Sequence, residues 1–240
     1  MIQLDAPGSN VFSKFFLRII WQLDVPVTHS ADPESKHLDI GAGSTPRNPF
    51  QAASLFAVDT NEWSNHAAAF THVKGDLTKT LPFEDNTFTS LSAYDVLEHI
   101  PRWEREGSEI RYPFIGLMNE ISRILKPGGI FLAVTPAIPS HAAFSDPTHV
   151  NVISRETILY FAGQDAWART IGYGFVGHFQ VIAQTWLRGA GPYTQFSLVG
   201  EFKTAPIRLM VEIILKLLKR FGRLFKRQKP THILWVIQKP

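Results

Sequence analysis

Short apolar runs alternate with polar, glycine-rich or proline-rich stretches along most of this chain. Such runs, bounded by turn-forming residues, are typical of strands in a sheet. The pattern predicts seven strands, at residues 37–41, 55–58, 72–76, 88–94, 130–135, 175–186 and 232–238. Apolar positions at helical spacing predict helices over 9–23, 113–125 and 154–172. Strands separated by helical stretches indicate βαβ units and a parallel sheet.

Composition narrows the class of protein. The chain has 240 residues and a hydrophobic fraction of 45%, ordinary for a globular domain with a core. It contains no cysteine, which excludes disulfides, thiolate nucleophiles and cysteine-ligated zinc, and which fits a reducing compartment. The first residues lack the pattern of a signal peptide, and no 18 consecutive residues are apolar. We therefore expect a cytoplasmic protein without a membrane span.

The strand predicted at 37–41 ends in an acidic residue, Asp39, followed by Gly41 and Gly43. Two glycines spaced by one suit a tight loop in which backbone approaches a ligand closely. In an open α/β sheet, ligands bind in the crevice at such strand ends. The dinucleotide fingerprint requires a third glycine, and Pro46 occupies that position, which counts against a nicotinamide cofactor.

Three further acids end successive predicted strands, namely Asp59, Asp76 and Asp95. Each alone is typical of a solvated turn or a helix cap, but three in succession behind a glycine loop favour a ligand site. An acid at the position of Asp59 can accept both hydroxyls of a ribose. Nothing in the pattern brings these acids together at one point, so we expect no metal site.

Five motifs carry a resemblance to a known family: Leu38–Gly43 (LDIGAG), Ala57–Asp59 (AVD), Lys74–Leu77 (KGDL), Tyr94–Ile100 (YDVLEHI) and Glu120–Gly129 (EISRILKPGG). In this order they resemble the class I S-adenosylmethionine-dependent methyltransferases of type 11. The resemblance covers residues 36–137 well and the rest loosely. It implies an α/β fold with a Rossmann-like, seven-stranded, mostly parallel sheet and helices on both faces.

The resemblance also implies which residues bind S-adenosylmethionine: Asp39, Gly41, Ala42, Gly43, Asp59, Thr60, Asp76, Leu77 and Asp95. The glycines would line the methionine part of the cofactor, and Asp39 would hold their loop and the amino group. Asp59 would bind the ribose hydroxyls. Asp76 would face the adenine amine with Leu77 on the ring, and Asp95 would lie near the methionine end.

Chain organisation follows from these motifs. We expect an N-terminal helix and cover over 1–35, the S-adenosylmethionine-binding core over 36–137 and an acceptor-side region over 138–240, all in one domain. A general base would come from the acceptor side, and the candidates are His99 and His149, with Asp146 as an assisting group. The alternative for each histidine is a structural hydrogen bond.

A basic segment precedes the last predicted strand. Residues 203–229 hold nine Lys/Arg and one acid, a net charge of +8, so the chain's overall +3 leaves −5 elsewhere. We therefore expect no nucleic-acid partner. Residues 206–226 predict a helix with a narrow charged stripe and a wide apolar face, which must be covered by the core, by a second copy of the chain or by an anionic membrane at its inner face.

The function that we expect is methyl transfer from S-adenosylmethionine to an oxygen of a small-molecule, saccharide or lipid-linked acceptor. Two alternatives stay open. One is a cofactor-binding partner subunit without catalysis, because a methyltransferase needs few catalytic side chains. The other is an NAD(P)-dependent oxidoreductase, against which Pro46 counts.

Overall fold

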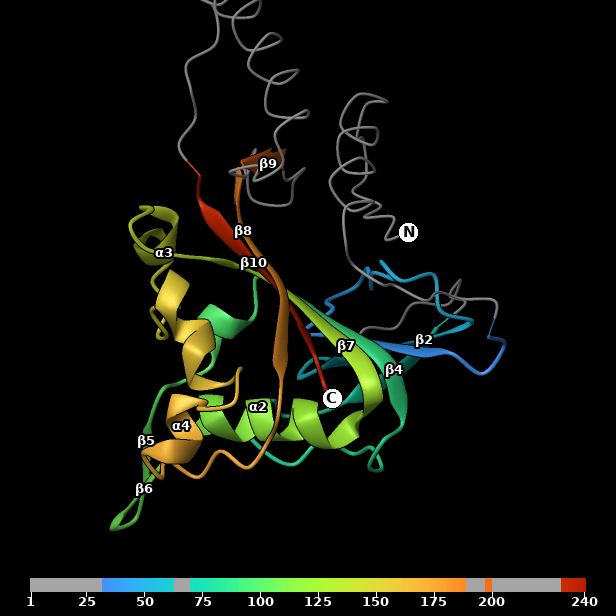
Figure 1. Cartoon of the computed structure of the whole chain (residues 1–240), viewed down its shortest axis with the longest axis horizontal. Coiled ribbons are helices and arrows are strands. Elements are labelled where there is room, and N and C mark those ends of the chain that lie inside the picture. Colours follow the sequence, from blue (N-terminus) through green and yellow to red (C-terminus); the bar gives the residue numbers. More distant parts are fainter. Residues whose placement is uncertain (1–31, 63–69, 189–196, 200–229) are drawn as a thin grey trace, which may run out of the picture.

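A computed structural model describes residues 32–62, 70–188, 197–199 and 230–240 of the chain, and its centre is one mixed sheet (Figure 1). In spatial order the sheet contains β3 (Thr71–Lys74), β2 (Ser54–Asp59), β1 (Lys36–Ile40), β4 (Phe88–Tyr94), β7 (Leu125–Pro136), β10 (His232–Gln238), β8 (Gln180–Arg188) and β9 (Ser197–Val199). The five strands from β3 to β7 run parallel, and β10 is antiparallel to both of its neighbours.

The seven predicted strands are all present, and the three-residue β9 extends the sheet beyond β8. The first residues of two of these strands were predicted wrongly. β7 begins at Leu125, before the proline and glycines that were expected to precede it. β8 begins at Gln180 rather than 175, because Phe175 and Phe179 are buried in the core cluster instead of joining the sheet.

The predicted helix 113–125 is confirmed as α2 (Pro113–Ile124), with a proline in its first turn. Proline is tolerated there because its missing N–H has no partner within the helix. Leu117, Met118 and Ile121 form the buried face of α2 and belong to the same core cluster as β-strand residues such as Leu38. α2 thereby covers one face of the sheet.

The continuous helix predicted over 154–172 is wrong. This stretch contains the 3₁₀ helix η2 (Arg155–Tyr160) and the short α4 (Trp167–Thr170). Ser154 does begin η2 through a capping box, as its position suggested. Gly163, at φ 98°, then turns the chain into a conformation that no helix accommodates.

Two short elements gave no hydropathy signal. The hairpin of β5 (Glu104–Glu106) and β6 (Glu109–Arg111) consists almost entirely of charged residues, so it lacks the apolar alternation of a half-buried strand. The connections 41–53 and 75–87, where βαβ units would place helices, contain turns instead. The predicted helices 9–23 and 206–226 lie outside the described residues. Within the described ranges, no helix has both the length and the apolarity needed to cross a bilayer.

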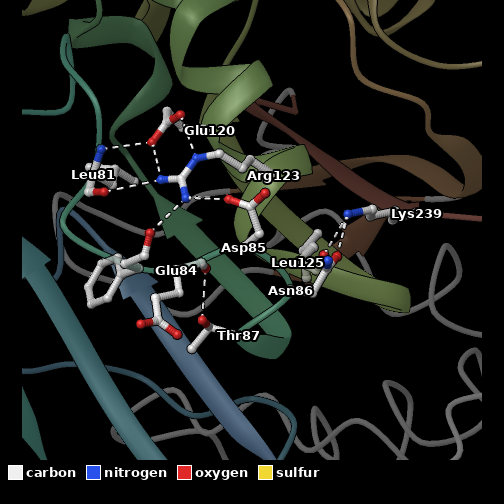
Figure 2. A network of polar contacts seen from close by, with 10 residues as sticks. Leu81, Glu84, Asp85, Asn86, Thr87, Glu120, Arg123, Leu125 and Lys239 are labelled. Atoms are coloured by element: carbon white, nitrogen blue, oxygen red, sulfur yellow. Dashed lines mark hydrogen bonds and ion pairs between the residues drawn. The ribbon is translucent and has the colours of Figure 1, made fainter.

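One arginine fastens α2 to the connection between β3 and β4 (Figure 2). Arg123 donates to both oxygens of Glu120, to Asp85 Oδ1 at 2.9 Å and to the carbonyls of Leu81 and Phe83. Glu120 Oε2 also accepts from the Leu81 backbone N–H at 2.8 Å. These hydrogen bonds fix the loop that connects β3 to β4.

Candidate active site

The carboxyl ends of β1, β2, β3 and β4 meet along one edge of the sheet, and backbone hydrogen bonds continue beyond the strands there. Gly41 donates to the Val58 carbonyl at 2.8 Å, and Gly75 donates to the Asp59 carbonyl at 2.9 Å. Asp95 donates to the Val134 carbonyl at 2.8 Å. The residues that follow each strand therefore lie side by side at this edge, where open α/β sheets bind ligands.

The loop after β1 requires glycine for two separate reasons. Gly41 and Gly43 both have left-handed backbone, with φ of 63° and 57°. A Cβ on Gly41 would lie 2.4 Å from Val96 Cγ2, whereas a Cβ on Gly43 would meet nothing within 4 Å. Val96 therefore leaves no room for a side chain at Gly41, whereas Gly43 borders open space in which a ligand can approach the backbone.

Asp59 connects the glycine loop to the end of β2. Its Oδ2 accepts from the Gly43 N–H at 3.1 Å, and its Oδ1 accepts from the Asn61 N–H at 2.9 Å. The hydroxyl of Thr60 lies 3.4 Å from Oδ1. The carboxylate is only partly buried and therefore remains open to further donors, such as the paired hydroxyls of a ribose.

Asp39 is buried on the face of β1 that points away from α2, and it binds the loop that follows β1. Its Oδ2 accepts from the Arg47 N–H at 2.8 Å, and its Oδ1 accepts from the Ser92 hydroxyl at 2.6 Å. Burial raises the pKa of this carboxyl to about 6, against the hydrogen bonds from Ser92 and Arg47. Both oxygens are engaged by the protein, so the geometry favours a loop-holding role.

The ends of β3 and β4 carry the remaining predicted cofactor residues. Asp76 Oδ1 accepts from the backbone and hydroxyl of Thr78 at 2.9 and 2.7 Å, and these hydrogen bonds lower its pKa. Leu77 is buried in the core cluster beside them. Asp95 has left-handed backbone at φ 55°, and its Oδ1 lies 3.1 Å from His232 Nε2.

The two predicted histidines meet beyond β4. His99 ends the 3₁₀ helix η1 (Leu97–His99), and His149 lies in the loop after α3 (Ala142–Ser145). Their rings lie edge to face with centroids 4.8 Å apart. The Val150 and Asn151 N–H groups donate to the Glu98 carbonyl, which holds the two segments together.

Sequence reasoning missed Glu98, which lies between these histidines. Its side chain is 1% exposed, and its Oε1 lies 4.0 Å from His99 Nε2 and 3.9 Å from His149 Nε2. Burial raises the pKa of Glu98 to about 8, and the nearby charges of Asp95 and Asp146 contribute. The signal in the sequence was a charged residue among the apolar residues of 96–100. The motif Tyr94–Ile100 was interpreted as a whole, so Glu98 received no role of its own.

Hydrogen bonds fix the orientation of both imidazoles. The Thr148 hydroxyl donates to Asp146 Oδ1 at 2.6 Å, so its oxygen accepts from His99 Nδ1 at 3.0 Å. His149 Nδ1 lies 3.3 Å from the Ala143 carbonyl, which can only accept. A neutral ring held in this way carries its proton on Nδ1, and its Nε2 is the nitrogen that lies near Glu98.

Comparisons with known proteins agree with this arrangement. Residues 38–133 match the sequence profile of a family described as a methyltransferase domain. A sterol 24-C-methyltransferase of Schizosaccharomyces pombe is 32% identical over 114 residues, which is 41% of this chain; the chain spans about a quarter (27%) of that relative's length.

Solved structures share the fold. An S-adenosylmethionine-dependent methyltransferase from Archaeoglobus fulgidus matches with a TM-score of 0.50 at 15% identity, covering 95% of this chain and 93% of the other. The [4+2]-cyclase SpnF matches with a TM-score of 0.52 at 14% identity, covering 100% and 86%. Residues 38–133 thus match a methyltransferase domain, and the sheet has the Rossmann-like fold of class I S-adenosylmethionine-dependent methyltransferases.

Proposed function

We propose that this protein transfers a methyl group from S-adenosylmethionine to an oxygen of a small-molecule, saccharide or lipid-linked acceptor. The observation that carries the proposal is the arrangement at one sheet edge of the glycine loop, the Asp59 carboxylate and two oriented histidines beyond β4. The first two suit the cofactor, and the histidines are the groups that we assign to the acceptor.

The chain's residues fit S-adenosylmethionine. Gly43 leaves backbone open to the methionine part, Asp59 and Thr60 offer acceptors for ribose hydroxyls, and Asp39 keeps the loop in place. Asp76 and Leu77 are assigned to the adenine, and Asp95 to the methionine end. When bound, the cofactor supplies an electrophilic methyl group on a sulfonium, so the protein mainly has to align the acceptor, which is worth roughly 7–11 kcal/mol.

His99 is the residue that we assign to the acceptor hydroxyl. Its Nε2 carries the free lone pair, and its side chain is 37% exposed, so an acceptor can reach it. It can accept the hydroxyl proton as the acceptor oxygen attacks, which is worth about 10²–10⁴-fold in rate. His149, at 9% exposure, is better placed to orient than to contact an acceptor directly.

A second candidate is methylation at a carbon atom of a lipid. The relative from Schizosaccharomyces pombe is named for transfer to a sterol carbon, and this chain carries the basic segment 206–226 that suits an anionic membrane surface. Flotation with anionic vesicles tests the membrane contact. Transfer from deuteriomethyl-labelled cofactor into lipid and glycan extracts, followed by mass spectrometry, separates O-methyl from C-methyl products.

Calorimetry with S-adenosylmethionine and S-adenosylhomocysteine tests the cofactor assignment. We expect micromolar binding by the wild type, loss of binding in Asp59→Ala, and retention in Glu62→Ala, which removes an exposed acid just after the same strand. Binding of NAD in place of either ligand would support the oxidoreductase alternative. Cofactor binding without turnover of any extract would support a non-catalytic partner subunit; the cyclase SpnF also cautions that this fold alone does not specify methyl transfer.

A further inference from the structure

We propose that Glu98, His99 and His149 together bind a divalent transition-metal ion beside the acceptor position. The three side chains place one potential ligand atom each within 4.8 Å of one another. Two imidazole nitrogens and one carboxylate oxygen are a common ligand set for such ions, and nitrogen ligands favour them over Mg²⁺ or Ca²⁺.

The first argument is that three potential ligand atoms lie close to one another without a hydrogen bond between them. Because the Nδ1 atoms are engaged as donors, the Nε2 atoms of His99 and His149 are left as potential ligands 4.0 and 3.9 Å from Glu98 Oε1. Glu98 Oε1 is buried and has no hydrogen-bond partner, whereas Oε2 accepts from the Thr135 hydroxyl at 2.9 Å. An unpartnered buried carboxylate oxygen is costly, and a cation is the partner that satisfies all three atoms at once.

The second argument is distance. Separations of 3.9 and 4.0 Å between oxygen and nitrogen are too long for hydrogen bonds. Three ligands that are each about 2.1 Å from one ion lie about 3.4–3.6 Å apart, so these two pairs need to close by about half an ångström. The two histidine nitrogens, which lie within 4.8 Å of each other, need to close by up to about 1.4 Å.

The third argument is that the imidazoles are already held as metal-ligating histidines usually are. His99 Nδ1 donates to Thr148, which donates to Asp146, and His149 Nδ1 faces the Ala143 carbonyl. Such outer hydrogen bonds fix the ring and its tautomer. Because His99 is partly exposed, the ion would keep open positions on that side for an acceptor oxygen.

Binding of the ion does not depend on the proposed function, but its role toward the acceptor does. An ion at this place would lower the pKa of a bound acceptor hydroxyl and thereby take over the activating role of a free imidazole.

The test is titration of the untagged, chelator-treated full chain with Co²⁺, followed by its visible absorption bands and by calorimetry. We expect one ion per chain, loss of binding in Glu98→Gln and His149→Ala, and unchanged binding in His178→Ala, which removes an exposed imidazole elsewhere. Thr148→Val keeps all three ligands and should weaken binding by roughly 10–100-fold, so it tests the site if a ligand variant fails to fold.

The proposal is overturned if the folded wild type binds no Co²⁺, if the ligand variants bind as the wild type does, or if Mg²⁺ is preferred. Calorimetry with S-adenosylhomocysteine on the same samples separates the two proposals. Cofactor binding without metal binding would overturn only this inference, and metal binding without cofactor binding would overturn only the proposed function.

Discussion

Asp39→Asn is a substitution for which the structure gives both the sign and the size of an effect on stability. The folded protein raises the pKa of Asp39 to about 6 because burial disfavours its charge, whereas an ordinary aspartate has a pKa of 3.8. Between these values the folded state binds more protons than the unfolded state, so the free energy of unfolding falls as pH rises. Above pH 6 the ionised carboxylate costs about 3 kcal/mol.

Asparagine can keep the hydrogen bonds of Asp39 without the charge. Its carbonyl oxygen can accept from the Arg47 N–H, and its amide can donate to Ser92 Oγ. The Ser92 hydroxyl is then available to donate to His37 Nε2, which lies 2.9 Å away. The second amide N–H has no partner among these groups and costs about 1–3 kcal/mol at every pH. Relative to the wild type, we therefore expect Asp39→Asn to be more stable at pH 7.5 than at pH 4, by up to about 3 kcal/mol.

The assay is urea unfolding of the ligand-free protein at constant ionic strength across pH 4 to 8. Asp165→Asn is the matched control, because Asp165 is exposed and should leave the pH profile unchanged. Parallel pH profiles for Asp39→Asn and the wild type would show that burial does not govern this carboxyl.

Further substitutions test the glycine loop and the Arg123 hydrogen bonds of α2. Gly41→Ala and Gly43→Ala share the strain of a positive φ, roughly 1–3 kcal/mol, but only Gly41→Ala also meets Val96. Chemical denaturation should therefore show a larger loss of stability for Gly41→Ala, and equal losses would refute the close contact. Arg123→Ala should lower the free energy of unfolding by about 2–3 kcal/mol and Arg123→Lys by less, because lysine cannot reproduce the two-pronged bond to Glu120. Burial favours a higher pKa for Glu120, but the hydrogen bonds from Arg123 hold it below its ordinary 4.5. The stability that Arg123 contributes should therefore persist at neutral pH and be lost only below pH 4.5. Loss of this effect near neutral pH would contradict the assignment.

The parallel half of the sheet was predictable because its strands are buried runs that end in recognisable residues. The boundaries of β2, β4 and β10 follow the apolar positions within about a residue, and α2 follows its helical spacing. The region after Pro136 was less predictable. Phe175 and Phe179 are as apolar as strand residues but fill the core from a loop, and hydropathy does not distinguish these two situations.

The residues of the candidate site also divide into those that the sequence predicts and those that it does not. Gly41, Gly43 and Asp59 are readable from the sequence because local backbone requirements select them, and they lie within a few residues of the strands that position them. Glu98 and Thr148 are not readable in this way, because their importance arises from a contact between segments about fifty residues apart.

That difference explains why the acceptor side is the part on which experiments should concentrate. The cofactor loop is specified by φ angles and by Val96, which limit what can replace its residues. The cluster of Glu98, His99 and His149 is specified by partners, namely Thr148, Asp146 and the Ala143 carbonyl, which orient two imidazoles toward one buried carboxylate.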